Sequence, residues 1–156
     1  MKELINRNLV LTSGLGPQRK LSFCPKKDIW HYLVNNPIKT GSKVLEIHWS
    51  INNKNLIESG ESALSKFSDL SQPSVRTVAL TKKHFESIKL KNKTQQSEDE
   101  IMHVEVRKED PGLFSVNGCL NPIELFFELR THPDERVQIS LSEMLNTYDL
   151  EVNTNE

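Results

Sequence analysis

The chain has 156 residues, of which 36% are hydrophobic and 26% are charged. A chain of this length is the usual size of one domain and can bury a core without disulfides or structural metal. Its 20 basic and 21 acidic residues give a net charge of -1, so no overall field attracts it to nucleic acid or membrane. Binding to a polyanion would therefore require a local basic patch.

The two cysteines and the hydropathy pattern indicate an intracellular setting. Cys24 and Cys119 lie far apart, and neither belongs to a Cys-x-x-Cys motif, so we expect two free thiols in a reducing compartment. No apolar run approaches the roughly 20 residues that span a bilayer, and residues 1–7 lack the apolar core of a secretion signal. The sequence predicts a cytoplasmic protein without a metal or cofactor.

The N-terminal residues predict a β-hairpin and one helix. Two short runs favour strands, and the sequence Gly-Leu-Gly-Pro separates them. The helical spacing of Ile29, Trp30 and Leu33 favours a helix, which an Asn-Asn-Pro sequence ends. The two strands and the helix are predicted over residues 8–12, 18–24 and 25–34.

A strand is predicted from residue 44 to residue 51, because its side chains alternate between two faces. The face that should pack inward is apolar, whereas His48 belongs to the outer face. The inward set consists of Leu45, Ile47, Trp49 and Ile51.

The central part of the chain predicts two helices, three strands and a loop. One helix begins at Gly60 and runs to about Leu70, and Thr81 caps a short helix that contains Phe85 and Ile88. β-Branched and alternating residues favour strands at 75–80, 101–107 and 113–116. Residues 89–100 are polar and lack periodic apolar side chains, which predicts an exposed loop.

The C-terminal part predicts a pair of helices. Asn121 is an N-cap residue, Pro122 suits the first helical position, and Glu124 can reach back to the cap. The stripe predicted for this helix contains Ile123, Phe126, Phe127 and Arg130, broadened by Leu125 and Leu129. The second helix begins near Pro133, and its apolar stripe consists of Val137, Leu141, Met144, Leu145 and Tyr148.

These elements predict an α+β fold, with a mixed or mainly antiparallel sheet, helices on one face and a C-terminal helix pair. We divide the chain into an N-terminal unit (residues 1–43), a main domain (residues 44–150) and a frayed, acidic tail (residues 151–156).

Ser62, in the sequence Gly-Glu-Ser-Ala-Leu, superficially resembles a nucleophile elbow. That motif needs a second glycine two residues after the serine, and Leu64 occupies this position. Ser62 is therefore interpreted as a residue of the first helical turn.

The five histidines could in principle contribute to a metal or catalytic site, but no pair has the short spacing of zinc ligands. An enzyme would need residues distant in sequence, such as Glu46, His48 and His103, to assemble in the fold. We predict no catalytic, cofactor-binding or metal-binding residues.

Two local groups of charged residues are candidate contact sites. Arg19, Lys20, Lys26 and Lys27 form a basic cluster that could contact DNA phosphates, although a solvated charged turn explains it as well. In the helix pair, Asp134 and Glu135 point about 100° apart, which suits helix-dipole stabilisation better than acid–base catalysis. The candidate partner contacts there are Arg130, Asp134, Glu135 and Arg136.

Three stretches resemble AbiEi-type antitoxins and related bacterial winged-helix regulators. They are Leu-Glu-Ile-His-Trp-Ser-Ile at 45–51, Glu-Ser-Gly-Glu-Ser-Ala-Leu-Ser at 58–65, and the helix pair that begins with Asn-Pro-Ile-Glu-Leu at 121–125. The resemblance spans roughly residues 44–148. It implies a non-enzymatic antitoxin or repressor-like protein that binds and neutralises a partner, for example a nucleotidyltransferase toxin.

The resemblance also implies a DNA-reading domain in front of the antitoxin part. Residues 8–24 could be the wing of such a domain, with Arg19 and Lys20 at its tip, but no recognition helix precedes them. DNA binding therefore stays an open alternative that lacks a recognition helix for sequence-specific reading, whereas partner binding does not depend on that helix. The alternative is an immunity protein or a phage-encoded inhibitor that binds a toxin or defence effector, which gene context would distinguish.

Overall fold

The computed structural model describes residues 10–14, 16–18, 20–36, 42–48, 56–91 and 101–150. The chain divides into two compact units, one formed by Met1–Ile38 with Val152–Glu156 and the other by Lys39–Glu151. Each unit is described by itself. Of the predicted features, Arg19, the end of the strand at 49–51, most of the loop at 89–100 and the tail at 151–156 lie outside the described residues.

The first unit contains the predicted hairpin and helix. Strands β1 (Val10–Ser13) and β2 (Lys20–Phe23) pair antiparallel, with the short 3-10 helix η1 (Gly16–Gln18) between them. Helix α2 (Lys26–Asn35) follows and buries Trp30. These elements are confirmed. Leu11, Leu21 and Phe23 of the hairpin are exposed.

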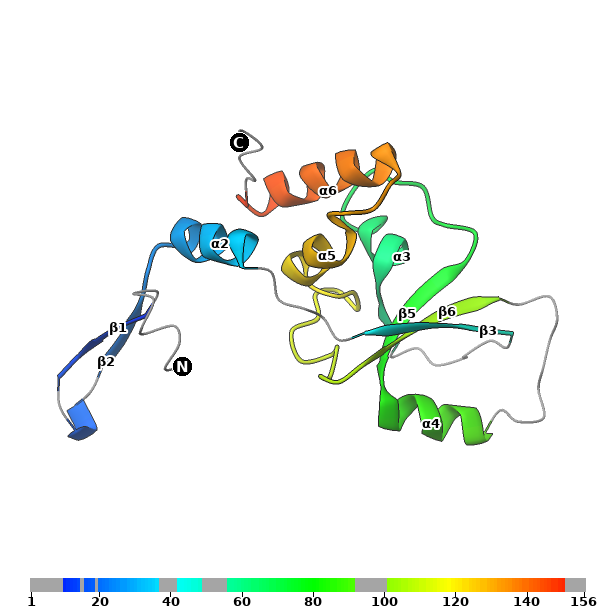
Figure 1. The fold of residues 1–156 in the computed structure, drawn as a ribbon, viewed down its shortest axis with the longest axis horizontal. Coiled ribbons are helices and arrows are strands. Elements are labelled where there is room, and N and C mark those ends of the chain that lie inside the picture. The colour runs from blue at the N-terminus through cyan, green and yellow to red at the C-terminus, as the bar shows by residue number, and fades with distance from the viewer. Residues whose placement is uncertain are drawn as a thin grey trace. The chain divides into compact units, whose positions relative to one another are not determined.

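The second unit is built on a four-stranded mixed sheet (Figure 1). Its strands are ordered β3-β6-β5-β4; β5 and β6 are parallel, and the two outer pairs are antiparallel. Parallel neighbours require a crossover, and helix α4 (Lys82–Lys91) lies in that connection. The strands are β3 (Lys43–Ile47), β4 (Ile57–Glu58), β5 (Arg76–Thr81) and β6 (Met102–Arg107).

Helix α4 covers one face of this sheet (Figure 1). Phe85, with the partly buried Ile88, packs against apolar residues that alternate along the strands, and Thr81 Oγ1 accepts a hydrogen bond from the His84 amide. The Thr81 cap predicted for this helix is thus confirmed. The inward face predicted for the strand at 44–51 is confirmed for its described residues, Leu45 and Ile47. The core on this side contains Ile47, Leu56, Val78, Leu80, Phe85, Met102 and Val104.

Three helices lie on the opposite side of the sheet: α3 (Gly60–Leu64), α5 (Pro122–Leu129) and α6 (Glu135–Thr147) (Figure 1). Helix α6 packs on α3 and α5, and its predicted apolar stripe is buried apart from the half-buried Tyr148. The predicted α+β class is confirmed. The most deeply buried apolar side chains here are Ala63, Leu64, Ala79, Leu120, Leu125, Val137 and Met144.

Helix α3 is shorter than predicted, since it ends at Leu64 instead of about Leu70. Beyond it the backbone tightens into three-residue turns, with Lys66 and Phe67 amides bonded to the carbonyls of Ala63 and Leu64. The Ser65 and Ser68 hydroxyls bond to preceding carbonyls. Serine side chains compete with helical backbone bonds in this way, which accounts for the early end.

Two further predictions in this unit are wrong. Residues 113–116 form turns and a single bridge from Val116 to Cys119, because Asn117 and Gly118 adopt positive φ angles of 52° and 76° and reverse the chain. Residues 89–91 belong to α4 and not to a loop.

The buried stripe of α5 also differs from the prediction. It consists of Pro122, Leu125, Phe126 and Leu129, whereas Ile123, Phe127 and Arg130 are half-buried. Leu125 and Leu129 point inward because both α3 and α6 pack against this helix, which makes its buried face broader than one stripe. No helix in the described ranges is both long and apolar enough to cross a bilayer.

Candidate functional site

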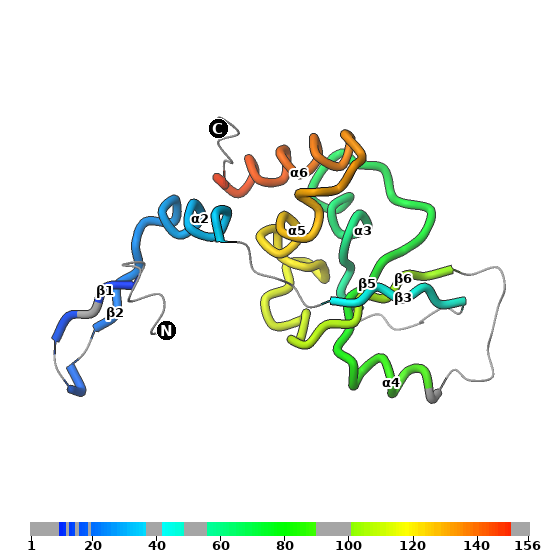
Figure 2. Tube along the Cα trace, in the orientation of Figure 1, coloured from blue at the N-terminus to red at the C-terminus, as the bar shows by residue number. Residues whose placement is uncertain are grey.

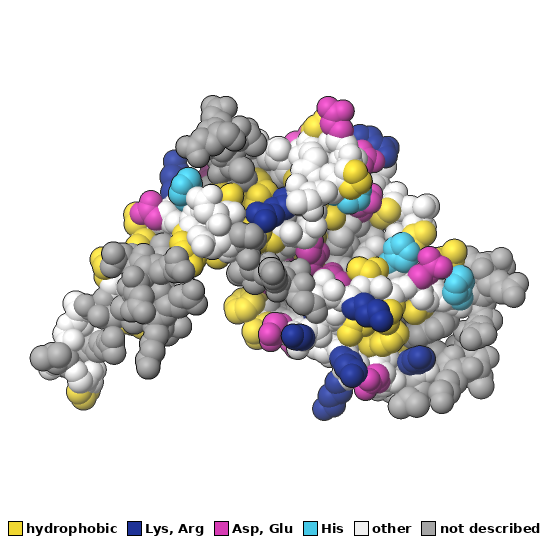
Figure 3. All heavy atoms as spheres, in the orientation of Figure 1, with side chains coloured by type: hydrophobic (Ala, Val, Ile, Leu, Met, Phe, Trp, Pro, Cys, Tyr) yellow, Lys and Arg dark blue, Asp and Glu magenta, His cyan; other side chains and the backbone are white. Residues whose placement is uncertain are grey.

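The N-terminal end of α6 is organised by Asp134 and Arg136. Asp134 caps the helix by accepting a hydrogen bond from the Arg136 amide, and its carboxylate also binds the Arg136 guanidinium, with Oδ2 2.6 Å from Nη2. These hydrogen bonds lower the pKa of Asp134 to about 2, so the cap stays ionised above that pH. Figure 3 shows acidic and basic side chains side by side over this end of α6.

The turn between α5 and α6 is held by side-chain contacts to its backbone. Gln138 Nε2 donates to the carbonyl oxygens of Leu129 and His132, at 2.9 and 2.8 Å. His132 Nε2 lies 3.5 Å from Glu61 Oε1 and so links this turn to α3. Side-chain contacts therefore fix the turn and its cap next to the surface beside α6.

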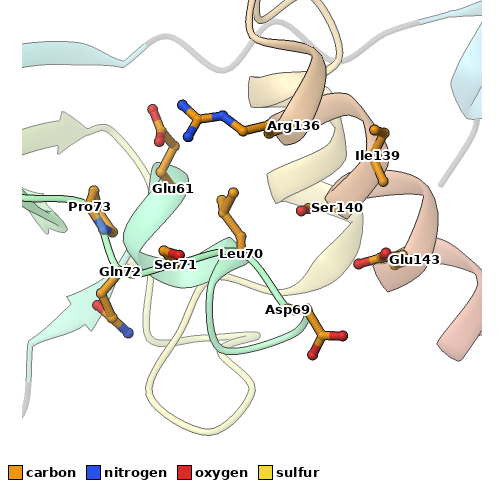
Figure 4. Close-up of a pocket in the computed structure, with 10 residues that line it drawn as sticks. All are labelled: Glu61, Asp69, Leu70, Ser71, Gln72, Pro73, Arg136, Ile139, Ser140 and Glu143. Carbon is orange, nitrogen blue, oxygen red and sulfur yellow. The ribbon is translucent and has the colours of Figure 1, made fainter.

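A groove of about 360 Å³ lies between α6 and the segment that follows α3. The two segments are distant in sequence but run beside each other (Figure 2). Figure 4 shows the lining side chains arranged along both walls. They are Glu61, Asp69, Leu70, Ser71, Gln72, Pro73, Arg136, Ile139, Ser140 and Glu143.

The groove is acidic, and part of its floor is apolar. Glu61, Asp69 and Glu143 carry three carboxylates. Among the lining residues that the structure describes, only Arg136 carries a positive charge, and it is already bound by Asp134. Ile139 is 53% exposed, although it belongs to a helix whose apolar stripe is buried. An exposed aliphatic side chain beside the exposed carboxylates of Asp69 and Glu143 can contribute to a recognition surface.

A second group of charges lies buried between β6 and α5. Arg107 is 9% exposed and forms an ion pair with Glu124 at 3.0 Å, while Glu105 lies at 3.8 Å. Its Nη1 also donates a hydrogen bond to Glu128 Oε1 at 2.9 Å. Burial, together with repulsion from the nearby Glu105 carboxylate and a hydrogen bond shared with it, raises the pKa of Glu128 to about 9. Glu128 is therefore protonated at neutral pH, and this group of charges holds α5 on the sheet.

The Arg107 group was not predicted from sequence, although one signal was present. Glu124 and Glu128 are four residues apart on one helix, where two like charges repel unless a cation lies between them. Alternation along β6 also places Glu105 and Arg107 on one face. Such a face is normally assigned to solvent, and only the packing of α5 makes it buried.

The residues proposed for an assembled enzyme site do lie together. Glu46 Oε1 is 3.4 Å from His48 Nε2, and Glu46 Oε2 is 3.6 Å from His103 Nε2. Figure 3 shows two histidines with an acidic side chain between them. All three side chains are at least one third exposed, and no His, Cys, Asp or Glu group in the described ranges could hold a metal ion.

Ser62 has a structural role. It is buried, and its Oγ accepts a hydrogen bond of 2.9 Å from the Thr77 amide, which ties α3 to β5. Both cysteines are free thiols, as predicted.

The predicted contact residues are only partly brought together. In the first unit, Lys20 lies on β2 and Lys26 and Lys27 lie in the first turn of α2, all three exposed. In the second unit, Glu135 and Arg136 are exposed at the start of α6, whereas the half-buried Arg130 stacks 5.4 Å from the Phe127 ring centre. Arg136 is the member of the predicted partner set that lines the groove.

The chain matches no protein-family model, and no curated protein or solved structure is significantly similar to it. The resemblance to AbiEi-type antitoxins therefore stays a prediction.

Proposed function

We propose that this chain is a non-enzymatic, antitoxin- or regulator-like protein that binds and neutralises a partner protein. The observation that carries the proposal is the groove beside α6, where exposed Ile139 lies beside the exposed carboxylates of Asp69 and Glu143. A preorganised surface loses little conformational freedom on binding, which favours tight association.

The chemistry of the groove supports recognition over catalysis. Its ten lining residues contain no histidine, cysteine or lysine, the side chains that most often serve as general base or covalent nucleophile at neutral pH. The ion pair of Arg107 with Glu124 and its hydrogen bond to Glu128 join α5 to β6. The resemblance of the sequence to antitoxins is the second support for this function.

The test begins with the protein that co-purifies from the native host. We expect that protein to arrest growth when it is expressed alone and to be neutralised when the full chain is expressed with it. Ile139→Asp should abolish neutralisation, because it places a charge on the apolar part of the groove. Val44→Asp is the matched control, since Val44 is 58% exposed on β3, away from the groove.

Two results would contradict the proposal. One is a co-purifying protein whose activity is unchanged by the full chain. The other is turnover of a hydrolase, nuclease or transferase substrate by a metal-free preparation, with loss of that turnover in a variant that replaces Glu46 and His103 by alanine.

A further inference from the structure

We infer that the groove beside α6 binds a basic side chain, carried by a short segment of the partner that also presents an aliphatic side chain. This inference rests on the proposed function and adds the chemistry of the partner. Its basis is the difference between the two ends of the groove.

One end of the groove is internally paired. Figure 4 shows Glu61 and Arg136 pointing toward each other at this end. Arg136 is bound by Asp134 at 2.6 Å, and Glu61 lies 3.5 Å from His132. Because both charges already have partners within the chain, a charged ligand group would gain little by binding at this end.

The other end carries two carboxylates without a cation. Figure 4 places Asp69 and Glu143 there, on opposite walls of the groove. Both side chains are exposed, and within the described ranges no residue forms an ion pair or side-chain hydrogen bond with either carboxylate. A lysine or arginine from a partner would complete this end, whereas a phosphate would be repelled.

Aliphatic side chains lie between the two ends. Leu70 and Ile139 both line the groove, on different walls, and Ile139 is 53% exposed. A volume of about 360 Å³ is near the lower limit of ligand pockets, which is about 300 Å³, so it holds one or two side chains. The complementary ligand is therefore a peptide segment with one aliphatic and one basic residue close together.

The experiment is an NMR titration of the full-length, ¹⁵N-labelled chain with two synthetic peptides. One peptide is acetyl-Gly-Ser-Leu-Gly-Lys-Ser-Gly-amide, and the other has glutamate in place of lysine. We expect the lysine peptide to shift the amides of residues 69–72 and 139–143, and to bind at least fivefold more tightly than the glutamate peptide. Raising NaCl from 50 to 500 mM should weaken its binding, because exposed ion pairs are screened.

The double variant Asp69→Asn, Glu143→Gln should lose the preference for lysine. Glu86→Gln with Glu109→Gln is the control, since it removes the same charge from two exposed acids outside the groove. Equal affinity for both peptides, or no shift at residues 69–72 and 139–143, would overturn the inference. If Ile139→Asp abolishes neutralisation of the partner but the double variant leaves partner affinity unchanged, the inference fails and the proposed function stands.

Discussion

Glu128 Oε1 lies 2.9 Å from Arg107 Nη1, within the interface between helix α5 and strand β6. The two side chains are 11% and 9% exposed, so the pair is shielded from solvent. Three carboxylates surround this one guanidinium. The three carboxyl groups cannot all ionise in so confined a space, so the folded chain keeps Glu128 protonated.

Glu128→Gln tests this protonation directly. The pKa of Glu128 is about 9 in the folded chain, against an ordinary value of 4.5. The folded state therefore keeps a proton that the unfolded state loses, and this side chain makes the free energy of unfolding fall as pH rises from 4.5 to 9. Glutamine imitates the protonated form of the side chain. The free energy of unfolding of the variant should therefore equal that of the wild type near pH 4.5 and exceed it by at least about 1 kcal/mol at pH 9.

The measurement is urea denaturation of both proteins at pH 5, 7 and 9. Glu86→Gln provides the control, since Glu86 is an exposed residue of α4. If the difference in the free energy of unfolding between Glu128→Gln and the wild type does not grow with pH, Glu128 is ionised in the folded chain.

Arg107→Met should destabilise the second unit severely. Methionine fits the space but leaves the Glu105 and Glu124 carboxylates without their cation and Glu128 without its hydrogen-bond donor, and removal of one partner from a buried ion pair costs about 3–5 kcal/mol. Chemical denaturation at pH 7 measures the loss. Arg76→Met is the control, because Arg76 pairs with Glu58 at 3.1 Å in a 44% exposed position. Similar losses for the two variants would contradict the special role of Arg107.

Ser62→Ala should cost about 1–3 kcal/mol of unfolding free energy. It removes the acceptor of the Thr77 amide, and an unsatisfied buried donor carries that penalty. Thermal unfolding followed by circular dichroism is the measurement, with the exposed Ser142→Ala on α6 as the control. If Ser62 were a nucleophile, the variant would keep its stability and lose an activity.

Cys119 should react slowly with iodoacetamide in the folded chain. Its side chain is 2% exposed, and its pKa is raised by burial and by the nearby Glu58 carboxylate, so little thiolate forms at pH 7.5. Mass spectrometry of the digested protein should show Cys24 alkylated first, because that residue is half-buried. Alkylation of Cys119 as fast as in 6 M guanidinium chloride would contradict its burial.

Local patterns were sufficient to predict most elements. The Asn121-Pro122 start of α5 and the Thr81 cap of α4 involve bonds between residues three apart, so short stretches of sequence specify them. The end of α3 was missed because Ser65 and Ser68 bond to carbonyls of their own segment, an alternative that apolar periodicity does not reveal.

The amino-acid sequence by itself determined the α+β class, the hairpin, and the apolar face of α6, because capping and periodicity act over a few residues. Only the tertiary structure decided that Glu105, Arg107 and Glu128 are shielded together beside the half-buried Glu124, and that residues 69–73 lie beside α6 to form a groove. Periodicity shows which side chains share a face. What covers that face depends on contacts between residues far apart in the chain.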